Sequence, residues 1–347
     1  MINKVYLFTL IFLGISSCNN DKIKNYKNKI STSDKCSINA YLFGENGRIF
    51  PKNYKEIIKN YEDLICNELE YVMWYPTFSD NFPIKDCEKV KKLGKTPHLT
   101  WEFYFSDSTN YQYMTQPIKN EYSLMNEILE GKHDKYLNKF ANDVKKYNGN
   151  ILIRPLHEFN GNWYLWSGFK NGKNKGGPDK VVSVWRYVVD IFIKNQVSNV
   201  KWVWNPHGPS IDMTKDNWNK ISNYWPGDDY VDWIAMDAYN WYPKDPWGGE
   251  RPFRDFDNCF KKLYNECIKI SKNHPIMIAE FGSPEFNFKD QNKALWIKDA
   301  FYKIKNEYPL IKSVTWFQIN KELDWRVNSS KESLIEFKKA ISDSYFY

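Results

Sequence analysis

The sequence predicts an α/β fold, a (β/α)8 TIM barrel that forms one domain. Two observations lead to this prediction. From Ser37 onward, short apolar segments of strand length alternate with amphipathic segments of helix length, which is the pattern of a parallel α/β sheet. There are eight such apolar segments, and eight parallel strands are the number that closes a barrel.

The predicted strands are residues 37–43, 71–78, 96–103, 150–156, 200–206, 230–239, 275–281 and 313–319. Helical periodicity is clearest at 135–147, where Leu137, Phe140, Ala141 and Val144 fall on one face. The other predicted helices are residues 179–195, 256–272 and 291–308. An open Rossmann sheet is the alternative, but no GxGxxG motif follows any strand.

The loop at 168–180 contains several glycines but no GK[ST] ending, so we predict a flexible excursion and not a phosphate loop. The sequence shows no internal repeat and no linker to a second domain. A chain of 347 residues is compatible with one barrel.

Composition argues for recognition of a semi-polar ligand. Hydrophobic residues make up 42% of the chain, which is ample for a core, while the aromatic share of 18% includes 15 Trp and 24 Tyr. Part of this excess is expected to form flat surface platforms with polar edges. The net charge of +7 comes from lysines that are scattered along the chain, so we expect a Lys-rich surface and no nucleic-acid partner.

The N-terminus predicts export. Lys4 precedes an apolar stretch, Val5–Ile15, that is too short to span a bilayer and fits a signal peptide over 1–17. The sequence ISSC that ends at Cys18 resembles the bacterial lipobox, whose cysteine is lipidated. The polar residues 18–35 then form a flexible tether. The alternative is an ordinary secretory signal. With the lipid anchor, the protein is a cell-envelope lipoprotein of the bacterial outer membrane or cell surface, touching the membrane through that anchor only.

Several kinds of site are disfavoured. Five further cysteines include no CxxC pair, so we expect isolated buried thiols and no disulfide framework: Cys36, Cys66, Cys87, Cys259 and Cys267. The five histidines have no metal-ligand spacing such as HxxxH, so no metal site is predicted. No GxSxG elbow is present, which excludes the usual serine-hydrolase arrangement.

In a barrel, the functional groups come from the C-terminal ends of the strands. Polar residues end six of the predicted strands: Glu102, His157, Glu158, Asn160, Asn205, His207, Asp237, Tyr239, Glu280 and Gln318. Two glutamates stand out, Glu158 after the fourth strand and Glu280 after the seventh, and their side chains can converge at the barrel mouth.

Two carboxylates at an aromatic-lined mouth are what glycoside hydrolysis requires. One donates a proton to the leaving oxygen, and their proximity separates their pKa values. Tryptophan rings can bind sugars by stacking: Trp163, Trp166 and Trp316. Each residue alone has an ordinary structural explanation: Arg154 can neutralise Glu158, His157 can be a satisfied buried histidine and a tryptophan can belong to the core. The joint occurrence on separate strands favours a site.

The segment RPLHEFNGNWYLWSG (154–168) resembles the signature of glycoside hydrolase family 26, which includes endo-β-1,4-mannanases, mixed-linkage β-glucanases and β-1,3-xylanases. Residues 128–149, 224–241, 278–283 and 321–330 are similar to other blocks of that family. The resemblance extends over nearly all of 37–346 and implies a (β/α)8 catalytic domain over 36–347.

The resemblance implies a retaining double displacement in which Glu158 is the acid/base residue and Glu280 the nucleophile. Retention requires carboxyl groups ~5–5.5 Å apart, whereas inversion requires ~6.5–9.5 Å.

The family pattern also implies that Arg154 and His157 lie beside the carboxylates, with His157 in contact with the nucleophile. Tyr239 is implied to hydrogen-bond Glu280, and Trp163 and Trp316 to line the sugar subsite next to the cleavage point.

Substrate identity is open at this stage. Family frequency favours β-1,4-mannan. The stretch Trp163–Ser167 (WYLWS) departs from the consecutive aromatics of many mannanases, which leans toward mixed-linkage β-glucan, with β-1,3-xylan also open. A non-catalytic glycan-binding lipoprotein would retain the tryptophans but lack one glutamate, and a structural envelope protein has no positive feature here. We expect a monomer that acts on a polysaccharide without a cofactor.

Overall fold

The computed structural model describes residues 34–44, 47–105, 124–208, 217–245 and 249–347. The predicted signal peptide, Cys18 and nearly all of the predicted tether lie outside the described residues. Among the helices of the described part, none combines the length and the hydropathy that a membrane crossing requires.

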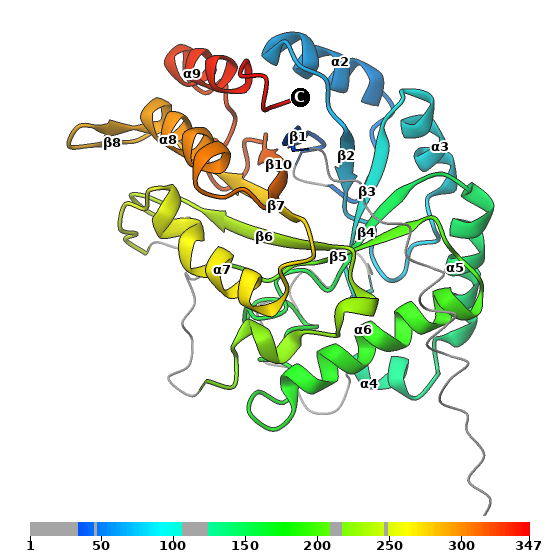
Figure 1. Ribbon diagram of the computed structural model, residues 1–347. Coiled ribbons are helices and arrows are strands. Elements are labelled where there is room, and N and C mark those ends of the chain that lie inside the picture. The colour runs from blue at the N-terminus through cyan, green and yellow to red at the C-terminus, as the bar shows by residue number, and fades with distance from the viewer. Residues whose placement is uncertain (1–33, 45–46, 106–123, 209–216, 246–248) are drawn as a thin grey trace, which may run out of the picture. The chain divides into compact units, whose positions relative to one another are not determined.

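Eight parallel strands form one sheet in the order β1-β10-β7-β6-β5-β4-β3-β2. Their bounds are β1 (Ser37–Tyr41), β2 (Tyr71–Trp74), β3 (Thr96–Trp101), β4 (Ile151–Pro155), β5 (Val200–Trp204), β6 (Trp233–Tyr239), β7 (Ile276–Gly282) and β10 (Ile311–Phe317). Each coincides with one of the eight predicted strands. The fold is the predicted (β/α)8 barrel, with strands inside and helices outside (Figure 1).

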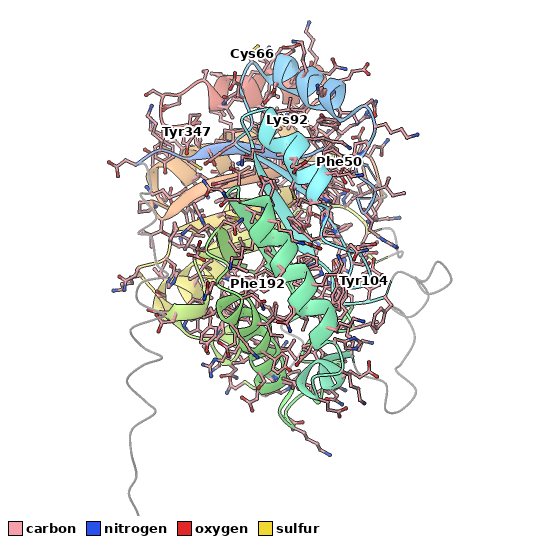
Figure 2. All side chains as sticks on the ribbon, turned by 90° about the vertical axis from the view of Figure 1, so that its right-hand side faces the viewer. Phe50, Cys66, Lys92, Tyr104, Phe192 and Tyr347 are labelled. Carbon is pink, nitrogen blue, oxygen red and sulfur yellow. The ribbon has the colours of Figure 1, made fainter. Side chains whose placement is uncertain are left out.

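The helical layer consists of α2 (Tyr54–Ile65), α3 (Ile84–Lys92), α4 (Leu124–Leu129), α5 (Asp134–Tyr147), α6 (Gly177–Lys194), α7 (Phe256–Ile270), α8 (Lys293–Asn306) and α9 (Lys331–Ile341). Figure 2 shows the side covered by α2, α3 and α5, with Cys66 and Lys92 at the ends of α2 and α3. The four predicted helices are confirmed as α5, α6, α7 and α8. The four residues of α5 predicted to share one face are all buried.

Smaller elements complete the described chain: the 3-10 helices η2 (Ile221–Tyr224) and η3 (Asp228–Tyr230), and a hairpin of β8 (Asn287–Phe288) and β9 (Gln291–Asn292). The loop predicted at 168–180 is shorter than expected. It forms turns up to Gly176, and α6 begins at Gly177 with Pro178 in its first turn, a position where proline is tolerated because its missing N–H has no helical partner there.

The barrel closes between β1 and β2 through a side chain. Those two strands share no backbone ladder within the described residues. Instead, Oδ1 of Asn39 accepts hydrogen bonds from the backbone N–H groups of Glu70 (3.0 Å) and Tyr71 (2.7 Å). Its Nδ2 donates to the hydroxyls of Ser37 (3.2 Å) and Ser313 (3.1 Å). We call this contact the β1–β2 seam.

The thiols follow the prediction with one exception. No disulfide joins the cysteines of the described part, and Cys36, Cys87, Cys259 and Cys267 are buried. Cys66 is exposed, so the prediction of a buried thiol is wrong there. Cys66 follows the last turn of α2 with a left-handed φ of 58°, and this position at the helix end faces solvent.

Candidate active site

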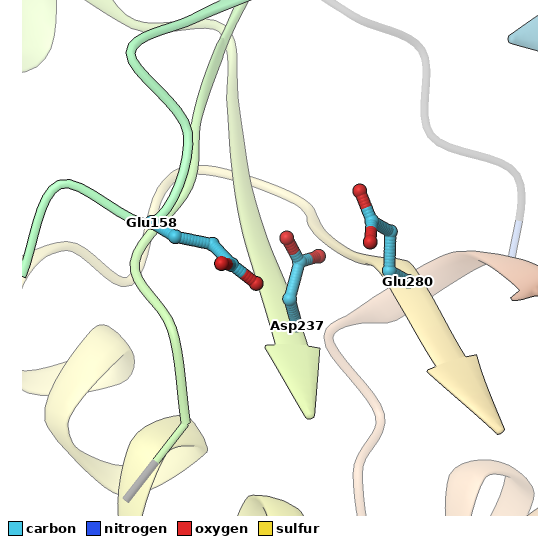
Figure 3. A group of neighbouring side chains, drawn as sticks. All are labelled: Glu158, Asp237 and Glu280. Carbon is cyan, nitrogen blue, oxygen red and sulfur yellow. The ribbon is translucent and has the colours of Figure 1, made fainter. Parts of the chain in front are cut away.

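Three carboxylates converge at the C-terminal ends of the strands, which we call the mouth of the barrel. Glu158 follows β4, Asp237 lies on β6 and Glu280 on β7 (Figure 3). One oxygen from each lies within 4.8 Å of the others, and all three residues are buried. Asp237 and Glu280 are direct partners in the pairing of β6 with β7, so the strand register itself places them side by side.

Glu280 is held by three donors. Its Oε1 accepts from the hydroxyl of Tyr75 (2.7 Å) and from Nη2 of Arg154 (2.5 Å), and its Oε2 accepts from the hydroxyl of Tyr239 (2.8 Å). Only 7% of Glu280 is exposed. Charge-assisted bonds of this kind stabilise the ionised carboxylate and fix its direction.

Arg154 is fully buried and connects several strands. Its Nη1 donates to Asp237 Oδ2 (3.1 Å) and to Asn205 Oδ1 (2.9 Å), and its Nε donates to the hydroxyl of Thr100 (2.9 Å). Burial lowers the pKa of the guanidinium, but the charges of Asp237 and Glu280 outweigh it and raise the pKa overall. Arg154 therefore stays cationic and offsets part of the negative charge of the three carboxylates.

Asp237 differs electrostatically from its neighbours. Burial and then the charge of Glu280 raise the pKa of Asp237 well above its usual value, although Arg154 opposes this. Because one guanidinium cannot balance three anions, a proton is most easily held on Asp237. Sequence reasoning placed Asp237 at the strand end but assigned it no role. Its position two residues before Tyr239, on the same face of β6, is the signal that could have identified it.

Glu158 is fixed by a strained loop. Leu156 and Glu158 both have a φ of 53°, a left-handed conformation that costs a non-glycine residue about 1–2 kcal/mol. The N–H of Glu158 donates to the carbonyl of Asn205 (2.7 Å). The side chain accepts from Nε1 of Trp163 at Oε2 (2.7 Å) and lies 2.9 Å from Nδ1 of His207 at Oε1.

The partners of Glu158 decide its ionisation. Burial raises the pKa of its carboxyl, but the interaction with His207 and the hydrogen bond from Trp163 outweigh burial and lower the pKa to about 2. The groups around Glu158 therefore favour its carboxylate form in the unliganded site.

His207 was not predicted to act in the site, yet it is firmly positioned. Oδ1 of Asn160 accepts from the backbone N–H of His207 (2.8 Å), and Nδ2 of Asn160 donates to the carbonyl of His207 (3.1 Å). The motif NPH after the fifth strand carries this residue. Asn160 thus links the loop that bears Glu158 to the loop that bears its histidine.

The hydrogen-bond partner of the His157 ring is the hydroxyl of an aromatic residue. Its Nε2 lies 2.9 Å from the hydroxyl of Tyr164, and its Nδ1 has no hydrogen-bond partner within the described part of the chain. Burial, followed by the charge of Arg154, lowers the pKa of His157 to about 3, so the ring stays neutral. The contact between His157 and Glu280 implied by the family pattern is absent from the hydrogen bonds of the described residues.

The predicted tryptophans occupy different places. Trp163 is half-buried beside Glu158. Trp166 is fully buried beneath Tyr164, with ring centroids 4.3 Å apart, and donates to the carbonyl of His157 (2.8 Å). It supports the loop from below.

Trp316 does not lie at the mouth. It is 1% exposed, packs against Phe281, Trp296 and Phe337, and donates to the carbonyl of Trp325. Its ring therefore faces the helical layer, and the expectation that it lines the sugar subsite is wrong. The next residue, Phe317, is half-buried and packs against Tyr41 and Tyr239, because successive strand residues point to opposite faces.

The segment that holds this site matches a known family. Residues 87–309 carry the sequence pattern of glycosyl hydrolase family 26. The chain belongs to this family. It is similar to "Endoglucanase H" of Acetivibrio thermocellus, with 36% identity over 273 residues, and to "Mannan endo-1,4-beta-mannosidase A and B" of Caldalkalibacillus mannanilyticus, with 27% identity over 212 residues.

These alignments cover 78% and 59% of this family 26 chain but only 27% and 36% of the two relatives, so the chain spans well under half the length of either. The fold is similar to that of the catalytic domain of an endo-β-1,4-mannanase from Bacillus sp. JAMB-750. The TM-score is 0.61 at 17% identity, with 94% of this chain and 90% of that chain covered.

Proposed function

We propose that the protein is a retaining endo-acting β-glycanase that hydrolyses β-1,4-mannan. The observation that carries this proposal is the approach of Glu158 and Glu280, whose nearest oxygens lie within 4.8 Å. This is close to the ~5–5.5 Å of retaining enzymes and too short for the attacking water that inverting enzymes hold at ~6.5–9.5 Å.

In the first step, Glu280 attacks the anomeric carbon and forms a covalent glycosyl ester. The glycosidic C–O bond breaks, and the leaving oxygen takes a proton from Glu158. In the second step, Glu158 removes a proton from water, which attacks the same carbon and releases Glu280. Two inversions give net retention. Arg154, Tyr75 and Tyr239 hold Glu280 in position for both steps.

His207 positions the acid of the first step. Its Nδ1 lies 2.9 Å from Glu158 Oε1, so the contact orients the carboxyl group that gives its proton to the leaving oxygen. After bond cleavage, Glu158 is a carboxylate and therefore a competent general base.

Mannan is proposed because relatives and neighbours of similar fold are named as mannanases. A β-glucan is the second candidate. It is favoured by the higher identity, 36%, to a relative named as an endoglucanase, together with the departure of the Trp163–Ser167 stretch from consecutive aromatics.

We also propose that the protein is exported and anchored by lipid on Cys18. The support is the apolar stretch that ends in ISSC, followed by a polar, lysine-rich segment.

The test uses purified protein on glucomannan, galactomannan, lichenan and β-1,3-xylan, with reducing ends quantified and the anomer of the first product followed by proton NMR. We expect release from mannans with β-anomers formed first. Glu280→Gln should abolish turnover by several orders of magnitude while substrate binding persists. Release from lichenan alone would move the assignment to the second candidate, and α-anomers as first products would contradict the retaining mechanism.

A further inference from the structure

A fourth carboxyl group, Glu102, lies at the mouth and has no part in the two steps above. It follows β3 directly, and its backbone continues the strand: its N–H donates to the carbonyl of Pro76 and its carbonyl accepts from the N–H of Phe78. Since side chains two residues apart share a face, Glu102 lies on the same face as Thr100, whose hydroxyl accepts from Arg154.

Glu102 is buried but not fully satisfied. Only 8% of the residue is exposed. Its Oε2 accepts from the hydroxyl of Tyr104 (3.1 Å), and Oε1 makes no hydrogen bond within the described residues. Oε1 does not belong to the fully buried side-chain atoms of the described residues that lack a partner, so it keeps accessible surface and can meet a bound ligand.

The charged and titratable groups around Glu102 come from several elements. Glu280 on β7 acts on it, as do Arg48 after β1 and Lys321 after β10. The hydroxyl of Tyr104 donates to Glu102, and the charge of Glu102 acts on Tyr41 and Tyr164. Glu102 thus lies close enough to Glu280 for the two charges to interact, and the charge of each acts on Tyr41 and Tyr164.

These surroundings favour the neutral acid. Burial is the main cause that raises the pKa of Glu102, to about 8, with the charge of Glu280 acting in the same direction and Tyr104, Arg48 and Lys321 opposing it. At neutral pH the group can therefore donate a hydrogen bond from one oxygen and accept one at the other.

We propose that Glu102 binds a hydroxyl group of the sugar unit on the nucleophile side of the scissile bond, as a hydrogen-bond donor. The inference rests on the proposed glycanase function and adds a substrate-binding residue to it. A neutral donor suits this place because a further negative charge beside the carboxylates of Glu158 and Glu280 would be unfavourable in a buried site. A protonated acid can donate a directed hydrogen bond without adding charge. Above pH 8 the donor is lost and binding weakens.

Binding is measured in the Glu158→Gln background, where turnover is blocked, with a manno- or gluco-oligosaccharide that wild-type protein cleaves. We expect the association constant to fall about tenfold between pH 7 and pH 9, following the protonated fraction of a group with a pKa near 8. The double variant with Glu102→Gln keeps an amide donor that does not ionise, so this fall should be absent. Glu130→Gln, an exposed side chain, is the matched control and should leave the pH dependence unchanged.

Kinetics give an independent readout. In otherwise wild-type protein, Glu102→Ala should raise KM at least tenfold at pH 6.5, and Glu102→Gln should restore most of that loss. Equal pH dependence of binding with and without Glu102→Gln, or an unchanged KM in Glu102→Ala, would overturn the inference. If wild-type protein cleaves no glycan, it is the proposed function that fails; if wild-type protein cleaves and Glu280→Gln does not, the function stands whatever Glu102 does.

Discussion

The guanidinium of Arg154 lies 2.5 Å from Oε1 of Glu280, and the two side chains are 0% and 9% exposed. The same guanidinium also contacts Asp237. Arg154 thus orients the proposed nucleophile and offsets part of the negative charge of the carboxylates at the mouth. A substitution of Arg154 should therefore affect both stability and activity.

Replacing Arg154 with Ala should destabilise the protein by about 3–5 kcal/mol, because it leaves two buried carboxylates without their cation. Activity should fall with it, and Arg154→Lys should recover only part of both, since an ammonium cannot reach Asp237 and Glu280 with a planar fork. Urea unfolding measures the first effect. The control is Arg326→Ala, whose pair with Asp324 is partly exposed and should contribute below about 1 kcal/mol. Similar losses for the two variants would contradict the assigned role of Arg154.

Asn160→Ala should lower kcat/KM roughly 10- to 100-fold, the scale expected when a reacting group is displaced by a fraction of an ångström to an ångström. The reason is that His207 loses both backbone contacts that hold it beside Glu158. Steady-state kinetics on the preferred glycan measure this effect. Asn195→Ala removes an amide that bonds Asn138 and the carbonyl of Ile191 away from the mouth, and kcat/KM should stay unchanged in this control.

Two tryptophans should respond in opposite ways to replacement by phenylalanine. Trp163→Phe removes the N–H that donates to Glu158, so kcat should fall about tenfold or more with little change in thermal stability. Trp316→Phe leaves a cavity in the helical layer and removes one of the two hydrogen bonds that the carbonyl of Trp325 accepts, so stability should fall by about 1–3 kcal/mol with KM unchanged. A raised KM in Trp316→Phe would show that this ring reaches substrate after all.

The raised pKa of Glu102 should make the free energy of unfolding depend on pH. Its pKa is raised from 4.5 to about 8 mainly by burial, so the folded protein holds a proton that the unfolded chain releases above pH 4.5. Its contribution is therefore fully present below pH 4.5 and is lost progressively as pH rises to about 8. Denaturant unfolding at pH 5 and pH 8 should show a decrease in the free energy of unfolding that is smaller in Glu102→Gln. Identical decreases in the two proteins would refute this.

The sequence was sufficient for the fold because all eight strands are short, apolar and separated by amphipathic segments. It was also sufficient to bring Glu158 and Glu280 together, since both follow strands of one barrel and must meet at its mouth. It could not orient Trp316. In a parallel strand buried on both faces, the apolar pattern does not alternate, so nothing in the sequence VTWF states which residue faces the mouth.

The contacts of His157 and His207 were equally inaccessible from sequence. Glu158 and Leu156 adopt left-handed conformations, which are uncommon for such residues, and they redirect the chain after β4. A pattern of residue types does not encode that turn, so the histidine expected at the nucleophile contacts Tyr164 instead.

The β1–β2 seam is the place where the barrel wall should open most easily. The amide protons of Glu70 and Tyr71 depend on one side-chain oxygen of Asn39. The N–H groups of Cys36, which precedes β1, and of Ile38 on β1 donate to the carbonyls of Tyr345 and Tyr347. Solvent deuterium should therefore enter this part of the barrel wall first, and removal of residues 345–347 should loosen the wall at the β1–β2 seam.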